Sequence, residues 1–355
     1  MTTKEVRFPF YAKASILLIG LGVFIGSLYV LQALILPLIF SMLIAIVLNP
    51  LVSFFVRLKI NRIVAIVMSI VIAFLIIAGV SILLITQVSQ FSESLPGMVD
   101  KISEMLNQIT AWVSARFNID PQNIQNWISN TKENLLKNSS SAIGLTLISV
   151  GSVLMVIVLV PVYVFLLLLY KAHLLQFIYS VVGSKHRLEV SEITGQTQTI
   201  VQHYLIGLLI EMVILAVLNS AGLLILGIDF AIMLGIIGAL INVIPYLGGI
   251  VAVALPMLMA LATKSPVYAL YVLAIYYFIQ LIDNNYIVPK IVASKVKINA
   301  LFSIIIVLAG NALWGIPGMF LSIPLLAIVK LIFDHIEPLK PWGVLLGDSL
   351  PDDKS

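Results

Sequence analysis

Long runs of uncharged, apolar residues dominate the chain, and short segments containing Lys and Arg separate them. A helix needs about 20 apolar residues to cross a bilayer, and a charge at its centre costs several kcal/mol. The charge-free runs therefore predict membrane-spanning helices. We expect these helices within residues 14–56 (two helices, with a turn at Pro37), 63–92, 142–170, 196–227 and 265–289. Two further apolar stretches, 230–263 and 298–329, are interrupted by Gly and Pro.

The composition supports the membrane assignment. Of the 355 residues, 61% are hydrophobic and 10% are charged, whereas soluble proteins have about 45–50% apolar and about 25% charged residues. The mean hydropathy is +1.13, which excludes a water-soluble fold. The net charge of +4 is small and no basic stripe occurs, so nucleic-acid binding is not expected. The absence of cysteine excludes disulfides, thiolate metal sites and cysteine nucleophiles.

The basic residues of the short loops predict a single orientation in the membrane. Cytoplasmic loops of membrane proteins carry an excess of Lys and Arg. Both termini are therefore expected in the cytoplasm of a bacterium, with the chain as a multi-pass protein of its inner membrane. The basic residues behind this prediction are Lys4, Arg7, Lys13, Arg57, Lys59, Arg62, Lys171, Lys185, Arg187, Lys290, Lys295, Lys297, Lys330 and Lys340.

These patterns divide the chain into five regions. Residues 1–92 hold three transmembrane helices, and residues 93–141 form an extracytoplasmic amphipathic helical insert. The insert either caps its own bundle or acts as a subunit-contact arm. Residues 142–195 supply the fourth transmembrane helix and a cytoplasmic amphipathic segment. Residues 196–335 form a transport core with two broken hairpins, and residues 336–355 form a cytoplasmic tail.

The two interrupted stretches predict re-entrant hairpins. Their halves have about 16 residues or fewer, which is short for about 30 Å of hydrocarbon at 1.5 Å per residue. The first break covers residues 242–249 and the second covers 310–318, and both combine Pro with Gly. Irregular backbone at membrane depth is tolerated only where protein buries it or water reaches it. The alternative is two ordinary pairs of short helices joined by Gly/Pro turns.

Two polar features lie inside the apolar bulk. Glu211 is expected mid-helix, either as a proton or cation site or as a protonated acid bonded to a neighbouring helix. Gln280, Asp283 and Asn284 share one side of a helix at i, i+3 and i+4, and Asn285 adds another amide. This cluster predicts a site for a polar solute or an ion. It could instead bind the freed backbone of the adjacent hairpin.

Enzymatic signatures are missing from the sequence. It contains no G-x-S-x-G, H-E-x-x-H, P-loop or G-x-G-x-x-G motif, and its four histidines lack metal-ligand spacing. We therefore expect no enzymatic activity, no cofactor and no metal site.

Five motifs carry a resemblance to a known family. At these motifs the sequence resembles the autoinducer-2 exporter family, also described as PerM-type permeases. They are QHYLIGLLIEM (202–212), ILGIDFAIMLG (225–235), NVIPYLGG (242–249), DNNYIVPKI (283–291) and LWGIPGMFLSIPLL (313–326). The resemblance implies a homo-oligomeric bacterial membrane protein. Members are linked to export of autoinducer-2, and others to sodium– or lithium–proton antiport.

The family pattern and the polar cluster together predict the residues of a transport pathway with its gates. The sequence departs from the pattern at Gly249 and at Asn299-Ala300, where the family commonly has proline. The predicted pathway residues are Asn242, Pro245, Tyr246, Gly248, Gly249, Gln280, Asp283, Asn284, Asn285, Pro289, Asn311, Trp314, Gly315 and Gly318. Glu211 and Asp283 are predicted to couple transport to protons or cations.

The resulting hypothesis is an all-α, polytopic secondary transporter that moves a small polar metabolite or signal, with the hairpins as gates. Its expected partners are that solute, protons or sodium, the lipid bilayer and further copies of the chain. A sodium(lithium)/proton antiporter is the first alternative. A non-transporting membrane scaffold, with the external insert recruiting partners, is the second.

Overall fold

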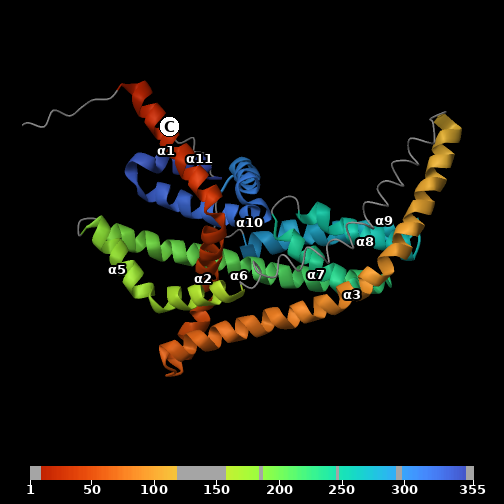
Figure 1. Ribbon diagram of the computed structural model, residues 1–355, viewed down its shortest axis with the longest axis horizontal. Coiled ribbons are helices and arrows are strands. Elements are labelled where there is room, and N and C mark those ends of the chain that lie inside the picture. The colour runs from red at the N-terminus through yellow and green to blue at the C-terminus, as the bar shows by residue number, and fades with distance from the viewer. Residues whose placement is uncertain (1–8, 118–156, 184–186, 245–247, 293–297, 349–355) are drawn as a thin grey trace, which may run out of the picture.

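A computed structural model describes residues 9–117, 157–183, 187–244, 248–292 and 298–348 (Figure 1). Within these ranges the regular secondary structure is helical and includes no strand. Six of the described helices are long and apolar enough to cross a membrane, or seven if a bent pair counts as one span. These observations confirm an all-α, polytopic membrane fold.

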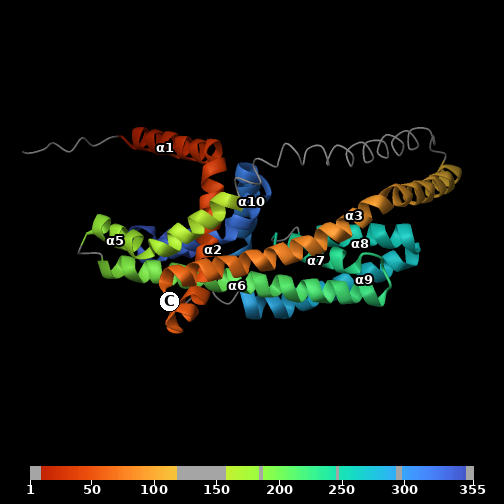
Figure 2. The same ribbon diagram turned by 60° about the horizontal axis from the view of Figure 1, so that its bottom comes forward.

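The first two helices meet at Leu31, not at the predicted turn. α1 (Phe10–Val30) and α2 (Gln32–Arg57) run in different directions on either side of this residue (Figure 2). The turn predicted at Pro37 is wrong, because Pro37 lies inside α2. Proline removes one backbone donor, but in apolar surroundings the remaining backbone groups are best satisfied within the helix, so the helix continues through it.

The third helix is much longer than predicted. α3 (Arg62–Phe117) has 56 residues without interruption, which corresponds to about 84 Å. The helix is therefore not interrupted at the boundary predicted between residues 92 and 93. The first residues of the predicted insert continue the membrane helix. Figure 1 shows the end of α3 projecting away from the other helices. Residues 118–141 of the predicted insert lie outside the described residues.

A bent pair of helices follows. The helix Ile157–Leu169 meets α5 (Lys171–Val182) at an angle of 64°. Arg62 fixes the first of these helices to the start of α3, because its guanidinium donates to the carbonyl oxygen of Leu168 at 2.9 Å. α6 (Arg187–Ile225) then begins nine residues before the predicted position 196, so the predicted amphipathic segment divides between α5 and α6.

The first interrupted stretch forms two short helices. α7 (Ala231–Asn242) and α8 (Gly248–Thr263) have 12 and 16 residues. They pack together and beside α6 and α9 (Pro266–Ile282), as Figures 1 and 2 show. A π-helical segment, Asp283–Val292, extends α9. Leu223, Leu234 and Val272 are completely or almost completely buried in the core between these helices.

The second interrupted stretch also folds back on itself. α10 (Ala300–His335) changes direction at Gly315, whose φ of 63° and ψ of −143° are not helical. The Ser322 hydroxyl donates to the carbonyl oxygen of Ile306 at 2.9 Å, although 16 residues of straight helix would separate the two by about 24 Å. The two halves of α10 therefore form a helical hairpin. A 3₁₀ turn (Glu337–Leu339) and α11 (Lys340–Leu346) complete the described chain.

Candidate transport site

A cavity of about 710 Å³ lies where α6, the α7–α8 hairpin, α9 and α10 meet. One part of its wall is polar and the remainder is apolar. The lining residues are Tyr204, Leu208, Glu211, Asn242, Val243, Ile244, Gly249, Ile250, Val253, Leu273, Tyr276, Tyr277, Gln280, Asp283, Asn284, Val288, Ile298, Ser303 and Ile323.

Asp283 is at the centre of the polar wall. It lies at the junction of α9 with the π-helical segment, and its side chain is 1% exposed. Its Oδ2 accepts hydrogen bonds from Asn242 Nδ2 and Gln280 Nε2, each at 3.2 Å. Gln280 Nε2 also lies 3.2 Å from Asn284 Oδ1. The contact predicted among Gln280, Asp283 and Asn284 is present, and Asn242 joins it from the end of α7.

Glu211 faces the same cavity from α6. Its side chain is 6% exposed, and it lines the cavity together with Asp283 and Tyr204. Glu211 Oε2 and Asp283 Oδ1 are both buried and, in the described structure, have no hydrogen-bond partner. A buried carboxylate oxygen without a donor is unfavourable by several kcal/mol in an apolar environment. Because both residues line the cavity, a ligand that donated hydrogen bonds to these oxygens would relieve this cost.

Two glycines bring the first hairpin against the polar wall. A Cβ at Gly248 would overlap the backbone of Asn242, so the end of α7 and the start of α8 are in direct contact. A Cβ at Gly249 would lie 2.5 Å from Gln280 Oε1, so this glycine leaves room for the Gln280 carboxamide. Pro245 and Tyr246, predicted at the tip of the hairpin, lie outside the described residues.

Other predicted pathway residues do not line the cavity. Asn285 donates to the carbonyl oxygen of Leu281 at 2.8 Å, and Pro289 and Asn311 are exposed. Trp314, Gly315 and Gly318 form the turn of the second hairpin. That hairpin reaches the cavity instead through Ser303 and Ile323.

Residues 17–337 match the family model described as AI-2E family transporter. The chain belongs to the AI-2E transporter family. It is therefore a multi-pass membrane protein of a transporter and permease family, and that family is not an enzyme family.

Named relatives of this AI-2E family chain cover most of its length. The "Putative transport protein YueF" of Bacillus subtilis is 24% identical over 269 residues, which are 74% of this chain and 73% of the relative. The "AI-2 transport protein TqsA" of Escherichia coli is 26% identical over 321 residues, 88% of this chain and 89% of the relative. The "Putative permease PerM" of the same organism is 24% identical over 250 residues, 69% of each chain.

Three tyrosines of the site were not predicted from the sequence of this transporter. Tyr204, Tyr276 and Tyr277 line the cavity, and Tyr276 is 7% exposed with a hydroxyl that has no partner in the described structure. The spacing of two of these tyrosines along their helices could have predicted them. Tyr204 precedes Glu211 by seven residues, and Tyr276 precedes Asp283 by seven residues, so each tyrosine shares a helix face with an acid.

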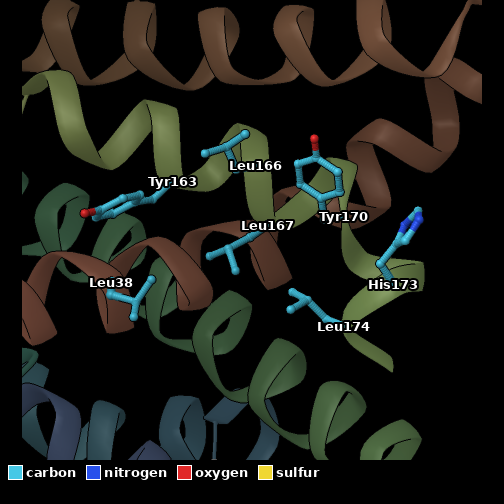
Figure 3. A pocket seen from close by; sticks show the side chains of 7 residues that line it. All are labelled: Leu38, Tyr163, Leu166, Leu167, Tyr170, His173 and Leu174. Carbon is cyan, nitrogen blue, oxygen red and sulfur yellow. The ribbon is translucent and has the colours of Figure 1, made fainter. Parts of the chain in front are cut away.

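A second hollow, of about 400 Å³, lies between α2 and the bend before α5 (Figure 3). Its wall is apolar apart from two tyrosine hydroxyls and the His173 imidazole. Figure 3 shows that the polar ends of Tyr163, Tyr170 and His173 point in different directions. A binding site needs convergent polar groups, so the first cavity is the stronger candidate.

Proposed function

We propose that the chain is a secondary transporter that exports a small polar metabolite or signal through the cavity of about 710 Å³. One observation carries the proposal. Two buried carboxyl groups, Glu211 and Asp283, line a single cavity between helical hairpins, and each has one oxygen without a hydrogen-bond partner in the described structure. Acids buried in membrane segments face a pathway or a partner, and they mark sites for substrates and ions.

The hairpins supply the gates in this proposal. We place both hairpins at membrane depth, entering from opposite faces, because their short helices and Gly/Pro breaks resemble the discontinuous helices of transporters. Asn242 closes the first hairpin onto Asp283. A movement of this hairpin would break that hydrogen bond and open the polar wall. Both termini lie in the cytoplasm in this arrangement.

Flux through proteoliposomes tests the proposal. The purified chain is reconstituted with defined ion gradients and a panel of small polar solutes that includes autoinducer-2, because TqsA is named an AI-2 transport protein. Asp283→Asn and Glu211→Gln should each reduce the flux about tenfold or more, because hydrogen bonds to charged groups contribute about 1.5–3 kcal/mol.

The matched control is Glu192→Gln. Glu192 is an exposed acid on α6, outside the cavity lining, and its carboxylate accepts from Gln196 at 3.1 Å. This variant should transport normally. Unchanged flux in both cavity variants would contradict the assignment of Glu211 and Asp283.

The same vesicles distinguish the alternatives. A sodium(lithium)/proton antiporter would move protons against either cation without an organic solute, which an enclosed pH-sensitive dye reports. The name of the relative TqsA, an AI-2 transport protein, favours solute transport. Deletion of residues 94–137 separates a transporter from a scaffold. Because the deletion removes Met98 from the core between α6, α7, α8 and α9, circular dichroism must first show that the variant folds; a folded variant that retains flux is a transporter. Cross-linking before purification tests the proposed homo-oligomer.

A further inference from the structure

Among the described residues, the titratable side chains with an acidic or basic group that line the cavity are all acidic. Among the described residues that line it, Glu211 and Asp283 are acidic and none is Lys, Arg or His. An ionised carboxylate can accept hydrogen bonds but cannot donate them. The wall therefore favours a solute that brings hydrogen-bond donors and positive charge, and it disfavours an anion.

The hydrogen bonds within the wall leave these acceptors free. Asn242 and Gln280 both donate to the same oxygen of Asp283, Oδ2, and neither reaches Oδ1. Glu211 Oε2, on the facing helix α6, has no donor within the described structure either. Both side chains are more than nine-tenths buried, so neither carboxyl group faces open solvent.

The remainder of the wall suits a carbon skeleton. Tyr204, Tyr276 and Tyr277 contribute aromatic rings, and aromatic faces attract ammonium groups. Apolar side chains such as Leu208, Val253 and Ile323 complete the lining. The cavity of about 710 Å³ is far larger than a metal ion needs, and pockets of about 300–1,000 Å³ hold organic ligands.

We infer that the solute is a protonated organic amine, and that a diamine engages both carboxylates at once. This inference rests on the proposed transport function and names its substrate class. The ammonium groups donate to Asp283 Oδ1 and Glu211 Oε2, and the methylene chain contacts the apolar wall. A neutral polyol would also supply donors, but it would not offset the cost of ionising two carboxyl groups in one buried cavity.

Binding to the detergent-purified full chain tests the substrate class. The probes share a four-carbon skeleton: 1,4-diaminobutane, butane-1,4-diol and butanedioate, with 1,3-diaminopropane and 1,6-diaminohexane to vary the distance between the charges. Isothermal titration and the shift of the melting temperature report binding. The diamines should bind and the diol and dicarboxylate should not. Asp283→Asn and Glu211→Gln should each weaken diamine binding about tenfold or more, and Glu192→Gln should leave it unchanged.

The outcomes separate this inference from the proposed function. If the diol or the dicarboxylate binds more tightly than the diamines, the amine assignment is overturned. It is also overturned if the protein transports another solute but binds none of the diamines. Diamine binding that survives both cavity substitutions would also overturn it. Diamine binding without flux of any solute in proteoliposomes would overturn the transporter and leave the amine site standing. Circular dichroism of each variant confirms that lost binding is not lost folding.

Discussion

The two helical hairpins of this transporter are built in different ways. The first, α7–α8, is tied to the cavity by side chains: Asn242 bonds Asp283, and Gly249 lies against Gln280. The second, within α10, is closed by contacts that involve its own backbone. A Cβ at Gly318 would overlap the carbonyl oxygen of Gly310, and Ser322 donates to the carbonyl oxygen of Ile306.

The second hairpin is also fastened to the N-terminal helices. Trp314 Nε1 donates to the carbonyl oxygen of Leu28 at 3.1 Å. Leu28 lies in the last turn of α1, where helix carbonyls lack a partner within their own helix. The first hairpin is also closed by a backbone contact, between Gly248 and Asn242. It is joined to the polar wall, however, by the side chain of Asn242, and such a hydrogen bond can exchange when a solute arrives. We therefore expect the first hairpin to move during transport and the second to remain fixed.

The largest effect on stability is expected at Gly318. In Gly318→Ala the new methyl group would overlap the backbone of Gly310, which cannot move without separating the two halves of α10. We expect a loss of about 3 kcal/mol or more, at the upper end for overpacking. Thermal melting in detergent, followed by circular dichroism, measures it.

Gly22→Ala provides the matched control for this substitution. A Cβ at Gly22, in α1, would meet no atom within 4 Å, and alanine is favoured over glycine inside helices by about 1 kcal/mol. This variant should melt at or above the temperature of the parent chain. If Gly318→Ala melts no earlier than Gly22→Ala, the second hairpin is not closed by backbone contact.

The sequence predicted where both hairpins break, because Gly and Pro act locally on backbone dihedrals. It also predicted the contact among Gln280, Asp283 and Asn284, because helical spacing determines which neighbours share a face. It did not predict that Asn242 bonds Asp283, which lies 41 residues away and on another helix. That contact depends on how α7 packs against α9, and hydrophobic periodicity does not determine such packing.

Pro37 and Leu31 show the same limit in the first helices. Proline was expected to end a helix, yet α2 continues through Pro37. The direction changes at Leu31, whose φ of −89° and ψ of 13° are not helical. No Gly or Pro marks that position. The turn lies three residues after Leu28, the acceptor for Trp314, so a tertiary contact adjoins the change in direction.

An effect on stability smaller than that of Gly318→Ala is expected where the second hairpin contacts α1. Trp314→Phe removes the donor to the carbonyl oxygen of Leu28 and part of a buried ring. The lost hydrogen bond and the reduced packing together should lower stability by about 1–2 kcal/mol. Trp342→Phe is the control, since Trp342 is exposed on α11. Equal melting temperatures for the two variants would show that the second hairpin is not fastened to α1.

The smallest effect on stability, and the most informative one for the gate, is expected at Gly249. The methyl group of Gly249→Ala would meet Gln280 Oε1 at 2.5 Å, and this atom is at the end of a flexible side chain. Gln280 can swing away, so we expect a loss below about 1 kcal/mol.

That movement would lengthen the bonds from Gln280 to Asp283 and Asn284 without removing their donor. Solute flux should therefore change several-fold while the melting temperature stays near that of the parent, and Gly22→Ala should alter neither. If Gly249→Ala lowers the melting temperature as much as Gly318→Ala is expected to, the first hairpin is as rigidly packed as the second. The division into a moving and a fixed hairpin would then be wrong.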